Sequence, residues 1–286
     1  MKHIKYFLEF IFIIILFLIF KLIGLKLSRI LASYLFVILG PLFRSKKTIY
    51  SNISLAFPNS EENLKKNISK KMWQSYGKIL AEYIFIKNFR NFNSEKYFSI
   101  TGQKILDEVK NSNEPVIFVS GHFDNFELMA MHIEKSGINL AAIYRPLNNY
   151  FLNPTMENIR KKFICEKQIK KGVSGTKEIL KHFKSGTSIA LMIDQRVSQG
   201  IKSKFFNKDA LTTTIPAQFV KKFNCKIVPI FIERNDVENF NLEIMNPLTF
   251  DNQETIESIT LKLNKILEKM IVRNPYQWIW SHNRWK

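Results

Sequence analysis

Apolar strands alternate with amphipathic helices over the second half of the chain, and this alternation constrains the fold more than any other feature. The run PVIFVS at residues 115–120 predicts a buried strand. Similar strands are expected at residues 138–144, 188–194, 226–233 and 239–245. Strands that are apolar on both faces are typical of a mainly parallel sheet covered by helices. The sequence therefore predicts an α/β fold with a mainly parallel central sheet flanked by helices.

Apolar residues at helical spacing predict the helices of this fold. Gly137 and Gly186 follow two of these segments and are suited to end them. Residues 59–90, before the first strand, have the same helical pattern and begin with acidic residues suited to a first turn. The helices expected among and after the strands cover residues 125–135, 154–163, 174–184, 215–223 and 255–272.

The N-terminal segment is apolar enough to enter a membrane. Its unbroken apolar core at residues 10–20 is flanked by lysines on both sides. A bilayer core needs roughly 20 apolar residues, so residues 6–25 span it only if Glu9 and Lys21 lie near the interfaces. Residues 24–32 contain no A-x-A pattern of a cleaved signal peptide, which favours an uncleaved anchor. We therefore expect an N-terminal transmembrane helix.

A second apolar stretch follows at residues 30–43 and is interrupted by Gly40 and Pro41. It is short for a span and is expected to lie in the membrane interface. The chain then divides into an anchor at residues 1–27, a helical and interfacial segment at residues 28–100, and a catalytic α/β domain at residues 101–286.

The net charge of +19 predicts a polyanionic neighbour. Nucleic acid, an anionic membrane surface, and a phosphorylated substrate or carrier all satisfy this expectation. The two cysteines, Cys165 and Cys225, are too few for a disulfide framework or a zinc-binding cluster. The more basic side of the anchor is the body of the protein, which favours a cytoplasmic body.

A histidine and a glutamate directly follow the first strand, in Ser120-Gly121-His122-Phe123-Asp124-Asn125-Phe126-Glu127. Open α/β sheets build their active sites at the carboxyl ends of strands. His122 is then a candidate general base for a substrate hydroxyl, and Glu127 a carboxylate that orients it. The alternative is structural: Asp124 as N-cap and Glu127 as its partner in a capping box. No G-x-S-x-G motif occurs, so a covalent acyl-enzyme is not indicated.

Polar residues also follow two other expected strands. Arg145 comes after residues 138–144, and Asp194-Gln195-Arg196 comes at the end of residues 188–194. Two arginines at neighbouring strand ends would converge on an anion beside His122, since guanidinium groups bind phosphate in a bidentate manner. Surface salt bridges are the alternative. The remaining histidines are scattered and H-E-x-x-H is absent, so we expect no metal site.

Taken together, these motifs resemble the bacterial lipid A biosynthesis acyltransferases, the lauroyl and myristoyl transferases that add secondary acyl chains. The resemblance extends over nearly the whole chain. Its segments are NISLAFPNSEENLKK, SGHFDNFEL, IYRPLNN, MIDQR, the block FFNKDALTTTIPAQFVKKFNCKIVPIFIER and the closing NPYQWIWSHNRWK.

The resemblance implies a glycerolipid acyltransferase-like fold and an H-x-x-x-x-E catalytic dyad, which maps onto His122 and Glu127. It also implies that substrate is bound by residues near the active site: Asn125, Arg145, Asp194, Gln195 and Arg196. The family usually has G-N-W where this chain has Asp124-Asn125-Phe126. A carboxylate at position 124 would be able to change the pKa of the histidine.

The implied reaction transfers a fatty acyl chain from acyl-carrier protein to a hydroxyl of a lipid A precursor, without a cofactor. The implied partners are the carrier protein, a phosphorylated glycolipid and the membrane, not nucleic acid. The implied location is the bacterial inner membrane, single-pass, with the catalytic domain in the cytoplasm.

Two rival functions remain open at this point. One is an acyltransferase of the same fold that acts on a glycerophospholipid or a glycosylated phospholipid. The other is a membrane-tethered basic protein that binds anionic lipid or nucleic acid, for which binding would depend steeply on salt and not on His122.

Overall fold

The computed structural model describes residues 2–91 and 95–286 and has a mixed α/β architecture. The central sheet has seven strands in the order β1-β9-β8-β2-β5-β3-β4. All neighbouring pairs run parallel except β8 and β9, which are antiparallel. The prediction of a mainly parallel sheet flanked by helices is confirmed. The strands are β1 (Phe98–Thr101), β2 (Ile117–Ser120), β3 (Leu140–Tyr144), β4 (Lys167–Lys170), β5 (Ser188–Met192), β8 (Ile227–Arg234) and β9 (Phe240–Ile244).

Every expected strand is present, within a few residues of the expected bounds. Two sheet strands, β1 and β4, were not expected, and neither was the separate antiparallel hairpin β6 (Ile201–Phe205) and β7 (Lys208–Thr212). These strands are rich in lysine or largely exposed on the sheet edges. Their apolar pattern is therefore too weak to distinguish them from loops.

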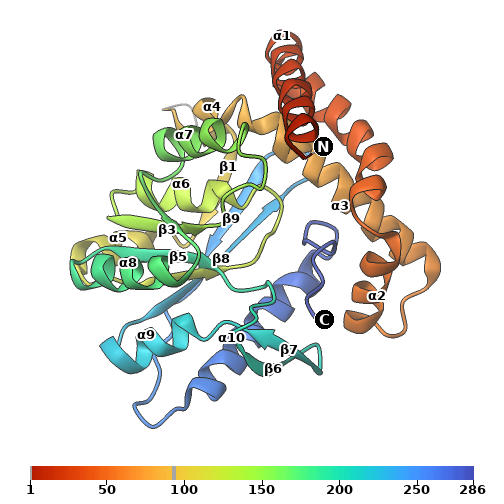
Figure 1. Ribbon diagram of the computed structural model, residues 1–286. Coiled ribbons are helices and arrows are strands. Elements are labelled where there is room, and N and C mark those ends of the chain that lie inside the picture. The colour runs from red at the N-terminus through yellow and green to blue at the C-terminus, as the bar shows by residue number, and fades with distance from the viewer. Residues whose placement is uncertain (1, 92–94) are drawn as a thin grey trace.

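Helices cover the sheet on both faces and along one side (Figure 1). The helices α1, α2 and α3 lie together on the right of Figure 1, whereas α5 and α8 lie on the left. Their bounds are α1 (Lys2–Phe43), α2 (Lys46–Ala56), α3 (Glu62–Tyr83), α4 (Ile86–Arg90), α5 (Gln103–Ser112), α6 (Glu127–Lys135), α7 (Asn153–Phe163), α8 (Val173–Lys184), α9 (Ile215–Phe223) and α10 (Ile256–Arg273).

Helix α1 contains both apolar N-terminal stretches and is kinked between them at Gly24. The φ of Gly24 is 77°, a value that favours glycine because it has no Cβ. The helix is long and apolar enough to cross a membrane. After the kink it packs closely on α3, where a Cβ at Gly77 would collide with the backbone oxygen of Ala32. Residues 30–43 are thus a helix docked on the body, with apolar side chains such as Ile38 still exposed.

Helix α1 contacts the body on both sides of its kink. Asn149, in the loop after β3, donates to the backbone oxygen of Tyr6 and to Glu9. Beyond the kink, Arg29 donates to the backbone oxygen of Glu238 at the β8–β9 turn. The outward face remains apolar and exposed, at Ile4, Leu8, Ile11, Ile15, Leu18 and Leu22. This face is suited to contact lipid.

Candidate active site

His122 lies in the turn that follows β2, at the carboxyl end of the central parallel strands. Strand β2 pairs with β5 in register, with Ser120 opposite Met192. His122 and Asp194 each lie two residues beyond this pair, so the strand register itself brings their side chains together. The Nδ1 atom of His122 is 2.8 Å from Asp194 Oδ1.

Asp194 is fully buried and accepts hydrogen bonds from three sides. Its Oδ2 atom accepts the backbone N–H of His122 and the indole N–H of Trp278, each at 2.8 Å. Burial alone would raise the pKa of the Asp194 carboxyl, but His122 and these N–H donors hold that pKa below its ordinary value. An ionised Asp194 only accepts, so Nδ1 of His122 carries a proton and donates it to Asp194. Gln195 Nε2 lies 3.4 Å from the Nε2 atom of His122.

Glu127, the carboxylate expected to orient His122, instead binds Arg160 and Tyr83. Arg160 donates from Nη2 and Nε to Glu127 Oε1, at 2.6 and 2.8 Å. The hydroxyl of Tyr83 donates to the same oxygen. Burial and the Glu127 carboxylate raise the pKa of Tyr83, so this hydroxyl keeps its proton. Glu127 therefore holds the guanidinium of Arg160, while Asp194 contacts the imidazole of His122.

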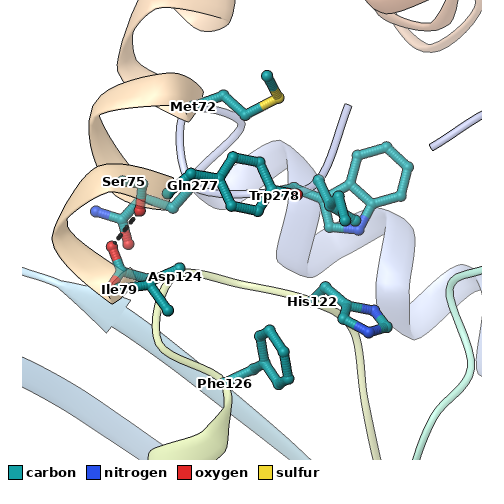
Figure 2. Close-up of a pocket in the computed structure, with 10 residues that line it drawn as sticks. Met72, Ser75, Ile79, His122, Asp124, Phe126, Gln277 and Trp278 are labelled. Carbon is teal, nitrogen blue, oxygen red and sulfur yellow. Dashed lines mark hydrogen bonds between the residues drawn. The ribbon is translucent and has the colours of Figure 1, made fainter. Parts of the chain in front are cut away.

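The structure also differs from the alternative interpretation of the motif, a capping box with Asp124 at the N-cap. Helix α6 begins at Glu127, with Phe126 at the N-cap and no side-chain cap hydrogen bond. Asp124 is not the N-cap; it has a φ of 35°, a left-handed conformation that a glycine would adopt more easily. Its carboxylate accepts from Ser75 on α3, from Arg234 on β8 and from the backbone N–H of Asn125. Figure 2 shows Asp124 directed toward Ser75, away from His122.

Asp124 belongs to a buried ion network, which we define by Arg29, Glu82, Asp124 and Arg234. Arg234 donates to Asp124 Oδ1 and to Glu82 Oε1, each at 2.6 Å. Arg29 donates to Glu82 at 2.7 Å. Since these side chains come from α1, α3, the His122 turn and β8, the network ties the kinked N-terminal helix to the turn that carries His122.

Asn125, expected to bind substrate, is buried against this network. Its Nδ2 atom donates to Glu82 Oε2 at 2.8 Å, and the residue is 1% exposed. Asn125 therefore supports the turn that carries His122 and does not line the large cavity described next.

A cavity of about 360 Å³ opens beside His122, and we call it the His122 cavity. Its polar lining includes Glu127, Arg145, Arg160 and Gln195 from the sequence motifs or their partners, together with Arg44, Lys171 and His282. Its apolar lining is formed by α6, β3 and β5, and includes the small residues Ala130, Ala142 and Ala190. Cations and a narrow apolar wall thus meet in the space that the histidine faces.

The two strand-end arginines are separated by the structure. Arg145 is exposed at the mouth of the His122 cavity and has no carboxylate partner among residues 2–91 and 95–286. Burial and the proximity of Arg145 lower the pKa of Lys171 below its ordinary value. Arg196 turns away: its Nε atom donates to the backbone oxygen of Lys286, and its backbone N–H to His282. Of these two arginines, Arg145 lines the His122 cavity and Arg196 does not.

Several residues of the site are not identified by the sequence patterns, among them Tyr83, Arg160, Arg234 and Trp278. Arg160 lies at the cavity wall, where Glu127 and Tyr83 hold its guanidinium. Its Nη1 atom is buried without a hydrogen-bond partner in the described part of the chain. The aromatic C-terminal tail that contains Trp278 was visible as a pattern, but no local signal linked it to Asp194.

Within the described residues, no group of three His, Cys, Asp or Glu side chains is arranged to hold a metal ion. The groups at the site are an imidazole, a buried carboxylate and several guanidinium groups.

Comparisons with known proteins identify similar sequences over most of the chain. The family model for bacterial lipid A biosynthesis acyltransferases matches residues 1–286. A lipid A biosynthesis acyltransferase of Haemophilus influenzae is 25% identical over 240 residues, which cover 82% of this chain and 75% of that protein. The lipid A biosynthesis lauroyltransferase of Escherichia coli is 24% identical, over 85% of this chain and 79% of its own. The lipid A biosynthesis palmitoleoyltransferase of Escherichia coli is 23% identical, over 86% of this chain and 80% of its own.

Proposed function

The chain belongs to the bacterial lipid A biosynthesis acyltransferase family, and on that premise we propose that it transfers a fatty acyl chain from an acyl-carrier-protein thioester to a hydroxyl of a lipid A precursor. One observation carries the mechanism. The His122 ring is held by a buried, ionised Asp194 at the edge of a cationic cavity, with Nε2 left as the acceptor. That is the arrangement of a general base.

In the proposed reaction His122 Nε2 removes the proton from the acceptor hydroxyl. The oxygen attacks the thioester carbonyl carbon, and the carbonyl oxygen becomes the oxyanion of a tetrahedral intermediate. The C–S bond then breaks, and the leaving thiolate takes the proton from the imidazolium. Asp194 stabilises that imidazolium and keeps the ring in one tautomer. The proton passes from the acceptor hydroxyl to the leaving thiol, and His122 returns to its starting state for another turnover.

Arg160 is the side chain that we assign to the oxyanion. Its guanidinium is fixed by Glu127 and Tyr83, and its Nη1 atom has a hydrogen-bonding capacity that no described residue uses. A pre-oriented donor stabilises developing negative charge without reorganisation during the reaction. In this proposal Glu127 is a positioning residue for Arg160, which accounts for a glutamate in the motif without contact to the imidazole.

The cations at the cavity mouth are suited to a phosphorylated acceptor. Arg145 and Arg44 line the cavity, and neither has a carboxylate partner within the described residues. Guanidinium groups without partners bind phosphate by paired N–H donors. We assign Arg145 to the acceptor phosphate, and the basic surface around it to the acidic carrier protein.

The alanine-lined wall is suited to the acyl chain. Ala130 and Ala190 line both the His122 cavity and a small adjoining recess that ends near Ile133 and Ile230. Small side chains leave a narrow apolar slot between α6 and the sheet, and an acyl chain would gain favourable burial there.

The membrane assignment rests on α1. We place the protein at the bacterial inner membrane, with the catalytic domain on the cytoplasmic side. Residues 6–25 are long enough for a single pass, whereas the contacts of Tyr6 and Glu9 with Asn149 keep the N-terminus beside the catalytic body in this conformation. Labelling of a cysteine introduced at Lys2, from either side of sealed membranes, distinguishes a single pass from a helix that lies in the interface.

A transfer assay tests the proposed function directly. Membranes that contain the protein are given acyl-carrier protein loaded with a labelled acyl chain, and the lipids are analysed by mass spectrometry. We expect one added acyl chain on a lipid A precursor. Acylation of a glycerophospholipid in its place would assign the protein to the rival acceptor class. Equal transfer by His122→Ala would contradict the mechanism.

A further inference from the structure

A second cavity, of about 600 Å³, lies on the side of the molecule where the kinked helix α1 meets the body. It is formed by α1 just after Gly24, by α3 and by the β8–β9 turn. None of its lining residues lines the His122 cavity. They include Lys26, Arg29, Ile30, Lys78, Val237 and Glu238.

Arg29 lines this second cavity and has one donor atom that no described residue uses. Its side chain is 9% exposed, its Nε atom donates to Glu82 and its Nη1 atom to the Glu238 backbone oxygen. The remaining Nη2 atom is buried without a hydrogen-bond partner in the described part of the chain. A buried guanidinium N–H without an acceptor costs free energy, so an acceptor supplied by a ligand would be bound favourably.

The charges around Arg29 leave an excess of one positive charge. The cations are Arg29, Arg234, Lys78 and Lys26, and the carboxylates are Glu82, Asp124 and Glu238. Glu238 does not remain free for Lys26, because it pairs with Lys78 and lies 3.6 Å from Arg234. A ligand with one negative charge, such as a phosphodiester, would neutralise the cavity.

The position of the second cavity indicates where that phosphodiester comes from. It lies at the C-terminal end of the apolar residues 6–25, where headgroups meet a membrane-bound helix. Beside it are exposed apolar side chains, among them Leu27, Ile30 and Val237, the last 74% exposed. A diacyl lipid would place its phosphate against Arg29 and Lys26 and its chains along this apolar surface.

We infer that the cavity between α1, α3 and the β8–β9 turn binds the headgroup of an anionic glycerophospholipid that is not a substrate. The ligand would hold α1 against α3 and, through Glu82 and Arg234, support the turn that carries His122. The inference does not depend on the acyl-transfer reaction.

Native mass spectrometry of the full chain in detergent tests this inference without a measurement of activity. The protein is titrated with phosphatidylglycerol and, separately, with zwitterionic phosphatidylcholine. We expect one tightly bound phosphatidylglycerol and weaker binding of phosphatidylcholine. Lys26→Glu should weaken the binding of phosphatidylglycerol at least about five-fold, the factor for roughly 1 kcal/mol per basic residue near an anionic surface.

The matched control is Lys66→Glu, which makes the same charge change on the exposed surface of α3, outside the second cavity. It should leave the affinity for phosphatidylglycerol within about two-fold of that of the parent protein. Equal losses in the two variants would show general attraction and overturn the site, as would equal binding of both lipids. Displacement of phosphatidylglycerol by millimolar inorganic phosphate would overturn the lipid assignment and indicate a site for free phosphate.

Discussion

The buried ion network and the His122 cavity use the same side-chain types in opposite ways. In the network each guanidinium has a carboxylate partner: Arg234 binds Glu82 and Asp124, and Arg29 binds Glu82. At the cavity mouth Arg145 and Arg44 have no such partner within the described residues. Paired buried charges stabilise one arrangement of the chain, whereas unpaired charges at a cavity are available to a ligand. The two regions should therefore respond to substitution in different measurements.

The largest effect is expected at His122. Without the general base, His122→Ala should lower kcat/KM for acyl transfer by about 10³-fold or more. The melting temperature should stay close to that of the parent protein, since the ring is partly exposed. His182→Ala, on α8 and outside the cavity, is the matched control and should retain activity. Loss of activity in both variants would indicate a general effect on folding.

Substitutions at Asp194 and at Glu127 distinguish the roles of the two carboxylates of the site. Asp194→Asn should lower kcat by about 10²- to 10⁴-fold, because the imidazole loses its tautomer and its charge partner. Glu127→Gln leaves Arg160 less firmly held and should lower kcat by a smaller factor. The ratio of the two losses, measured in one assay, decides the assignment. A larger loss for Glu127→Gln would return the orienting role to Glu127.

Arg234 tests the network through stability. Arg234→Met removes the partner of two buried carboxylates and should lower the free energy of unfolding by roughly 3–5 kcal/mol, measured by urea titration in detergent. Arg273→Met removes exposed ion pairs with Glu233 and Glu243 and should cost about 1 kcal/mol or less. Similar losses in the two variants would mean that the network contributes no more to the free energy of unfolding than a surface ion pair does.

Substitution of Arg145 should weaken binding of the acceptor and leave the stability of the fold unchanged. Arg145→Ala removes a bidentate phosphate donor and should raise the acceptor KM about ten-fold, with little change in kcat or melting temperature. A fall in kcat at constant KM would instead assign Arg145 to the oxyanion, in place of Arg160.

The smallest effect concerns His132, on α6 and outside the cavity. Burial, and then the nearby Lys135, lower its pKa from 6.5 to about 4. In the unfolded chain His132 therefore binds a proton near pH 6.5, whereas in the folded chain it does so only near pH 4. The free energy of unfolding thus decreases as the pH falls from 6.5 to 4. The loss should be about 1–2 kcal/mol, after a discount for partial exposure. In His132→Gln the dependence on pH between 6.5 and 4 should flatten; an unchanged slope would contradict the assignment.

Much of the sheet and the position of His122 were predictable from the sequence. The strands β2, β3, β5, β8 and β9 follow from short apolar patterns, and His122 follows directly from β2. Asp194 was identified as a strand-end residue, although its partner was not. The edge strands β1 and β4 and the β6–β7 hairpin were missed, since exposed strands have little apolar alternation.

The sequence by itself determined the fold class, the apolar N-terminal helix and the position of His122 after a buried strand, because these depend on local apolar patterns and on their order along the chain. The tertiary structure decided which carboxylate meets the histidine. Asp194 is 72 residues away in the chain and reaches His122 only because β5 lies beside β2 in that register. The same holds for Glu127 and Arg160, and for the network around Arg234. Charge pairing across a protein depends on strand order and helix docking, which local patterns do not encode.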